Sequence, residues 1–106
     1  MSNHEDIRKS LTTAMFTRAV NTDLYVHMLN GKKITLSPNA FPLSLEEDSI
    51  MEIGDDNDGR FIMLNLNHVA FVECSMPKKG ETSNMLNVMK NISKVMDMEY
   101  ENGGDD

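Results

Sequence analysis

The sequence predicts an α+β fold, in which a small, strongly bent antiparallel sheet or five-stranded barrel carries an N-terminal and a C-terminal helix. Apolar residues recur at helical spacing near both ends of the chain. Short apolar runs separated by Asn, Gly and Pro fill the centre, and one Asn-Gly pair lies between two of these runs. A chain of 106 residues has the size of one domain. We assign 1–100 to that domain and expect 101–106 to be a disordered acidic tail.

The first helix is predicted over residues 4–20. Ile7, Leu11 and Met15 repeat at intervals of four residues and therefore form one apolar stripe. The polar run Asn21-Thr22-Asp23 then ends the pattern. This helix offers one face to the central sheet.

A β-hairpin is predicted over residues 24–36, around Asn30-Gly31. A two-residue loop would pair His27 with Ile34 and would mix polar and apolar groups on both faces. A three-residue loop pairs Val26 with Ile34 and segregates them, with Gly31 in the left-handed position that closes a bulge. Since burial fixes the register of a hairpin, we expect the three-residue loop, with Lys33 exposed.

The middle of the chain predicts short strands joined by tight turns. Pro38 and Pro42 make 37–45 an irregular segment or a sheet edge, because proline cannot donate a hydrogen bond to a neighbouring strand. The further strands are expected at 49–53, 61–64 and 69–73. An acidic hairpin loop occupies 54–59; its spacing fails the calcium-loop pattern, which needs ligands at fixed positions and a closing Glu.

A second helix is predicted over residues 83–99, with a wide apolar stripe rich in methionine. The methionines either pack this helix on its own sheet or form adaptable contacts with another molecule. A helix that is apolar around much of its girth is usually buried on more than one side, so we expect self-association through it. The candidate contact residues are Met85, Val88, Met89, Ile92, Val95 and Met96.

Composition indicates an intracellular protein without a membrane span. The lone Cys74 rules out an internal disulfide, and hence a disulfide-stapled secreted scaffold. Residues 1–10 are polar, and no apolar run approaches the ~20 residues that cross a bilayer. We therefore expect a cytoplasmic protein.

No pattern in the sequence predicts a catalytic or metal site, and we expect no cofactor and no enzyme activity. His4, His27 and His68 have no partner at metal-ligand spacing. Cys74 lies between Glu73 and Ser75, which supply none of the positive charge that a reactive thiolate needs.

Residues 24–74 resemble the small barrels of the Sm-like and SH3-like kind, on the basis of Val26-His27-Met28-Leu29-Asn30-Gly31 and of 61–73. In Sm-like proteins a helix precedes a barrel that assembles into rings and binds RNA. This chain has no glycine in 34–37, and Leu66-Asn67-His68 stands where that family has a basic signature. The resemblance therefore implies a barrel more directly than RNA binding.

The function expected from these observations is a protein-binding adaptor or regulatory module. The net charge of −7 disfavours nucleic acid as a ligand, because phosphate binding needs a concentrated basic face. An Sm-like RNA-binding protein stays an alternative, and it requires Lys32-Lys33, Arg60 and Lys78-Lys79 to share one face. A second alternative is an acidic nucleic-acid mimic, which requires 46–48 and 55–58 to line up like phosphates. An adaptor should instead expose an apolar patch.

Overall fold

The structure is a computed structural model that describes residues 3–43, 48–55 and 59–103, with side chains described within 4–96. It contains the helices α1 (Asn3–Thr17) and α2 (Met85–Gly103), with the short 3-10 helix η1 (Leu66–His68) between two strands. The strands are β1 (Leu24–Met28), β2 (Lys33–Leu36), β3 (Ala40–Pro42), β4 (Ile50–Asp55), β5 (Arg60–Asn65) and β6 (Val69–Cys74). The chain is therefore α+β, as the sequence predicts.

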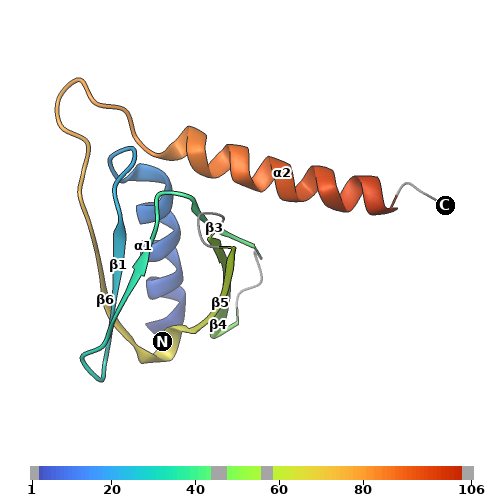
Figure 1. Cartoon of the computed structure of the whole chain (residues 1–106). Helices are drawn as coiled ribbons and strands as arrows, with labels where there is room; N and C mark the ends of the chain where they lie inside the picture. Colours follow the sequence, from blue (N-terminus) through green and yellow to red (C-terminus); the bar gives the residue numbers. More distant parts are fainter. Residues whose placement is uncertain (1–2, 44–47, 56–58, 104–106) are drawn as a thin grey trace.

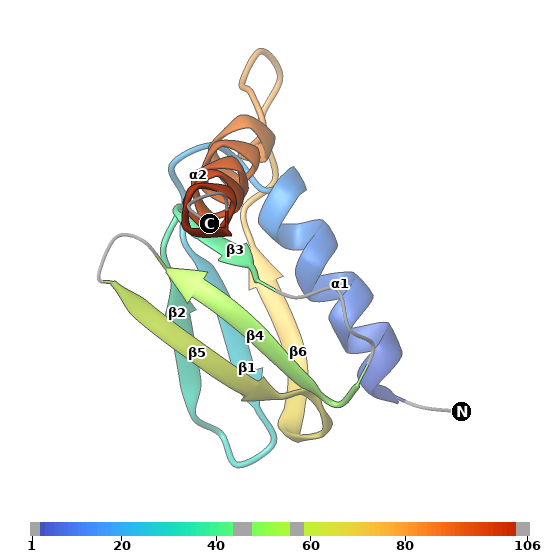
Figure 2. The same ribbon diagram turned by 90° about the vertical axis from the view of Figure 1, so that its right-hand side faces the viewer.

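The strands form two antiparallel three-stranded sheets that face each other across one core (Figure 1). The first sheet has the order β2-β1-β6, and the second has the order β3-β4-β5. Helix α1 covers the side of the core next to β6 (Figure 2). Both sheets and α1 contribute fully or almost fully buried side chains, among them Leu11, Met15, Leu24, Val26, Leu36, Met51, Ile53 and Leu64.

The β1–β2 hairpin has the predicted three-residue loop. Val26 lies opposite Ile34, and His27 lies opposite Lys33. The Met28 N–H donates to the Lys32 carbonyl at 2.8 Å, and Gly31 adopts a φ of 88°, which L-residues with a side chain rarely adopt. Val26 is fully buried, Ile34 is partly buried and Lys33 is exposed, so the predicted faces are also confirmed.

The predicted five-stranded barrel is not confirmed. The chain has six strands in the described residues, and they form two separate sheets instead of one closed ladder. The chain passes from the first sheet to the second through Ser37–Asn39, where the Ala40 N–H donates to the Ser37 carbonyl at 3.1 Å. The predicted edge is found just beyond, since β3 ends at Pro42 and pairs only with β4.

Helix α1 ends at Thr17, three residues before the predicted end. The next residues are held instead by backbone bonds to the segment that leads into α2. The Ala19 N–H donates to the Ser75 carbonyl at 2.8 Å, and the Val20 N–H donates to the Thr82 carbonyl at 3.1 Å. A pattern within the helix cannot reveal these partners, because they lie more than 50 positions away in the sequence.

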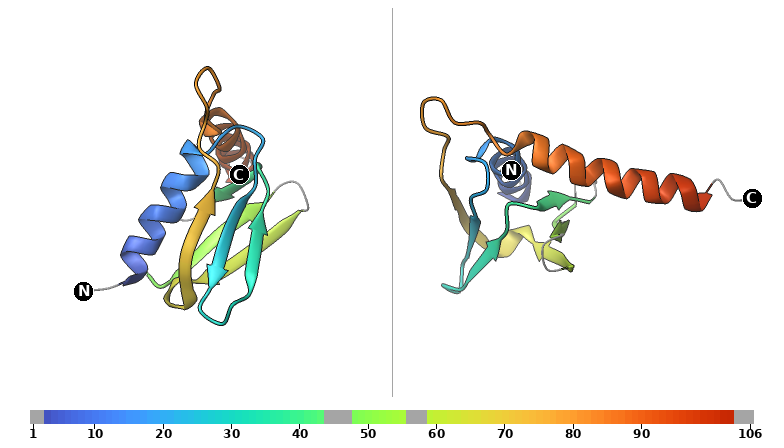
Figure 3. Two further views of the ribbon diagram at one scale, coloured as in Figure 1. Left: turned by 90° about the vertical axis from the view of Figure 1, so that its left-hand side faces the viewer. Right: turned by 45° about the horizontal axis from the view of Figure 1, so that its top comes forward.

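Helix α2 begins at Met85 and continues to Gly103, past the predicted end at residue 99. Its N-terminal part packs against α1 and β3. Figures 1 and 3 show the rest of the helix projecting away from the body, past the second sheet. Residues 104–106 of the expected tail lie outside the described residues.

Candidate functional site

Helix α2 is fastened to the body by asparagine side chains. Asn84 Nδ2 donates to the Pro38 carbonyl at 2.7 Å, and Asn87 Nδ2 donates to the same carbonyl at 3.3 Å. One turn further along, Asn91 Nδ2 donates to the Asn39 carbonyl at 3.1 Å. These amides recur three and four residues apart and so lie on one face of the helix, which they turn toward the link between the two sheets.

This attachment divides the six predicted contact residues between two faces of α2. Val88 is fully buried in the core of its own chain, and Val95 is half-buried against that core. Met85, Met89 and Met96 are 45%, 53% and 63% exposed. The sequence pattern joins all six into one broad stripe, whereas only part of that stripe faces the body.

A regular apolar seam runs along α2 beside the docked face, and three of its four side chains are exposed. Met85, Met89, Ile92 and Met96 follow one another at spacings of four, three and four residues, which is the spacing of residues that line a helix contact. Ile92 is half-buried at the border of the docked face, and Leu86, on the far side of the seam, is 80% exposed. We call Met85, Met89, Ile92 and Met96 the α2 seam.

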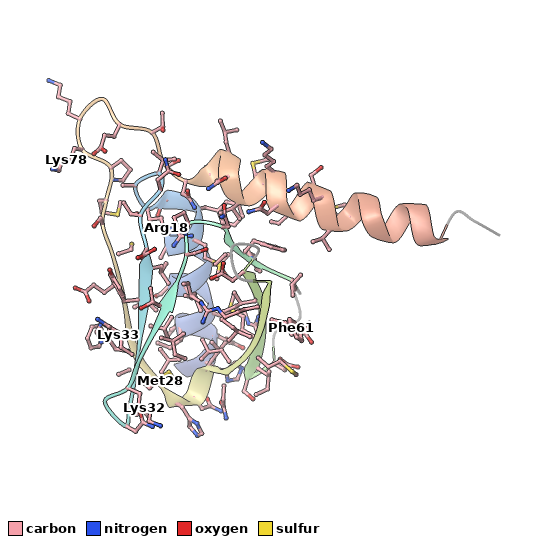
Figure 4. The ribbon with its side chains drawn as sticks, viewed as in Figure 1. Arg18, Met28, Lys32, Lys33, Phe61 and Lys78 are labelled. Carbon is pink, nitrogen blue, oxygen red and sulfur yellow. The ribbon has the colours of Figure 1, made fainter. Side chains whose placement is uncertain are left out.

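A second uncovered apolar surface lies on the outer face of the second sheet. Phe61 and Met63 on β5 are 58% and 63% exposed, and Ile50 on β4 is 36% exposed. Phe61 lies beside β5 on the side of the sheet away from α1 (Figure 4). This surface is not among the contact residues predicted from the sequence. The unbroken apolar run 61–64 could have indicated it. A strand that is apolar on both faces exposes one of them to solvent unless other elements pack against both faces.

A shallow hollow of about 230 Å³ adjoins Phe61 on this sheet. It adjoins Gly54, whose lack of a side chain leaves room for the outer edge of the Phe41 ring. A Cβ atom at Gly54 would stand 2.8 Å from Phe41 Cζ, so any other residue would displace the ring. The hollow is lined by Phe41, Leu43, Gly54, Asp55, Gly59, Arg60 and Phe61. It can receive an apolar side chain.

The basic residues do not gather on one face. Lys32 and Lys33 lie at the hairpin end of the first sheet, and Lys78 lies in the loop at the opposite end (Figure 4). Arg60 donates to the Thr35 carbonyl at 2.8 Å and to Asp55 at 3.1 Å.

The acidic groups that mimicry requires are dispersed or lie outside the described residues. Asp55 is 1% exposed, and its carboxylate turns into the body. Asp48 is 3.5 Å from the Arg8 guanidinium. Glu46, Glu47 and 56–58 lie outside the described residues, and 56–58 are half of the predicted acidic hairpin loop 54–59.

The candidate ligands and nucleophiles remain scattered. Within the described residues, no three His, Cys, Asp or Glu side chains are close enough together to hold a metal ion. His27 Nε2 lies 2.8 Å from a Glu73 carboxylate oxygen, and its ring stacks on Phe71 with centroids 4.2 Å apart. Cys74 is half-buried and carries a free thiol.

Comparison with known proteins adds no relative. No protein-family model, curated protein sequence or solved structure matches this chain. Neither described helix is long and apolar enough to cross a membrane.

Proposed function

We propose that this protein is a non-enzymatic protein-binding module, an adaptor or regulator, that self-associates through α2. The observation that carries the proposal is the α2 seam, an ordered row of apolar side chains on a helix that leaves its own body. Soluble monomers rarely expose large contiguous apolar surfaces, and such surfaces mark protein contacts. We place the protein in the cytoplasm, where its single cysteine is expected to stay reduced.

The exposed methionines suit this role physically. Burying one such side chain contributes about 1.5–3 kcal/mol, and the flexible thioether adapts to an imperfectly matched partner surface. The asparagine side of α2 is already hydrogen-bonded to the body. A second contact can therefore form without displacing the first.

No described feature favours the alternatives over protein binding. RNA binding of the Sm-like kind requires the basic pairs to converge, and they lie at opposite ends of the first sheet. Nucleic-acid mimicry requires displayed carboxylates, and Asp55 is buried. The exposed apolar surface is the feature that an adaptor requires.

Replacing both Met89 and Met96 with Asp should dissociate the protein. Each Asp would place a charge in an apolar contact, so the dissociation constant should rise by about 100-fold or more. Static light scattering across a dilution series measures this constant. Both side chains are more than half exposed in the single chain, so the circular dichroism spectrum should stay unchanged, and the urea midpoint should fall only to that of the dissociated wild type at high dilution.

Lys79→Glu supplies a matched control, because it changes the net charge by the same amount as the two methionine substitutions. Lys79 is exposed and lies in the loop between β6 and α2, outside the α2 seam. Its association should stay within about threefold of the wild type, as expected for an exposed charge outside the contact. Equal association of the wild type, the double variant and the control would show that the methionines do not carry self-association.

A further inference from the structure

We infer that the surface that receives the α2 seam is the outer face of the second sheet on another copy of this chain. This inference rests on the proposed self-association and identifies the second surface of that contact. Each copy presents one projecting apolar helix flank and one uncovered apolar sheet face. An amphipathic helix and an exposed apolar surface are matching halves of a common recognition mode.

The dimensions of the two surfaces match. From Met85 to Met96 the α2 seam rises about 16 Å, at 1.5 Å per residue. From Phe61 to Asn65 the outer row of β5 extends about 13 Å, at about 3.3 Å per residue. The hollow beside Phe61 gives one methionine of the seam a place to enter. A helix of this length therefore covers the exposed part of the sheet without overhanging it by more than a turn.

The charges also favour this pairing over contact between two α2 helices. Within 85–96 the charged residues of α2 are Lys90 and Lys94, in a chain whose net charge is −7. Glu52 shares the outer side of β4 with Ile50, and it lies opposite Met63 in the neighbouring strand. The segment 85–96, which carries only lysines, is complementary to a sheet that carries a carboxylate, whereas two such segments bring like charges together. Asp97, Glu99 and Glu101 lie farther along α2.

The buried area is large enough for a stable interface only if each copy contributes both its helix and its sheet surface. Seven large apolar side chains take part, and each of them is between 36% and 80% exposed: Ile50, Phe61, Met63, Met85, Leu86, Met89 and Met96. A large aromatic side chain buries about 150–250 Å² when fully covered, and Met and Leu are only slightly smaller. In a two-fold dimer each copy contributes both surfaces, which together approach the roughly 800 Å² per partner of a stable interface. The two-fold axis also closes the assembly at two copies.

Disulfide trapping between two single-cysteine variants tests the pairing. Both carry Cys74→Ser, and one adds Met63→Cys while the other adds Met89→Cys. Mixing them under mild oxidation should give a covalent dimer that joins position 63 of one chain to position 89 of the other. Peptide mass mapping identifies the bond, and mixing two different chains excludes a bond within one copy. Thr35→Cys, exposed on the first sheet, replaces Met63→Cys in a control mixture that should give no such product.

The outcomes separate the two proposals. Bonds only between two copies of Met89→Cys would show that α2 packs on α2, which overturns the sheet pairing and leaves self-association intact. A non-covalent dimer with neither bond would also overturn the sheet pairing. If light scattering finds the unmodified protein monomeric, the proposed function itself fails.

Discussion

Asp55→Ala is expected to lower the free energy of unfolding by about 3–5 kcal/mol, the usual effect of breaking a buried charged network. The Asp55 carboxylate is fully buried and accepts bonds from the Ser37 N–H at 3.1 Å and the Ser37 hydroxyl at 2.5 Å. It also accepts from Arg60 at 3.1 Å. Because Ser37 lies in the link between the sheets and Asp55 ends β4, the carboxylate fastens the second sheet to that link.

Urea denaturation followed by circular dichroism measures this loss. Asp48→Ala is the matched control, since Asp48 is a mostly exposed carboxylate whose nearest cation, Arg8, is 3.5 Å away. That control should cost less than about 1 kcal/mol, as exposed ion pairs do. Equal effects of the two substitutions would contradict the structural role given to Asp55.

Arg18→Ala is expected to lower the free energy of unfolding by about 3 kcal/mol or more, because it leaves a cavity and removes donors from one buried and one partly buried carbonyl. Arg18 is 0% exposed. Its Nη2 donates to the Ser37 carbonyl at 2.8 Å, and its Nη1 lies 3.5 Å from the Leu36 carbonyl. The side chain therefore holds the end of β2 against the end of α1.

Keeping the charged Arg18 side chain in the core costs desolvation free energy. Desolvation by burial lowers the pKa of Arg18, and the nearby Cys74, Asp23 and Asp55 partly oppose this shift. Arg18→Met keeps most of the volume and removes the desolvation cost, so it should lose less than half as much stability as Arg18→Ala. Parallel urea titrations compare the two. A loss below about 1 kcal/mol for Arg18→Ala would show that the Arg18 bonds do not organise the core.

Local patterns in the sequence predicted the elements that depend on local chemistry. The register of the β1–β2 hairpin followed from Gly31 and from the segregation of Val26 and Ile34 on one face. Strand positions and the edge at Pro42 followed from proline and from apolar runs. These features need only neighbouring residues, which is why sequence reasoning reaches them.

Features that depend on residues far away in the sequence could not be predicted from local patterns. The rotation of α2 is decided by amide bonds from Asn84 and Asn91 to the carbonyls of Pro38 and Asn39, about 50 positions earlier. The stripe on α2 was visible in the sequence, whereas the division between a buried Val88 and an exposed Met89 was not. The burial of Arg18 likewise depends on carbonyls of the β2–β3 link, and a solvated arginine was the natural expectation.

Sedimentation equilibrium of the wild-type protein at tens of micromolar tests the central claim, self-association of this chain, most directly. The account predicts a concentration-dependent mass that approaches twice the 12.0 kDa of one chain. A mass that stays at one chain throughout that range would contradict it. In that case the exposed methionines of α2 would have no partner in a second copy.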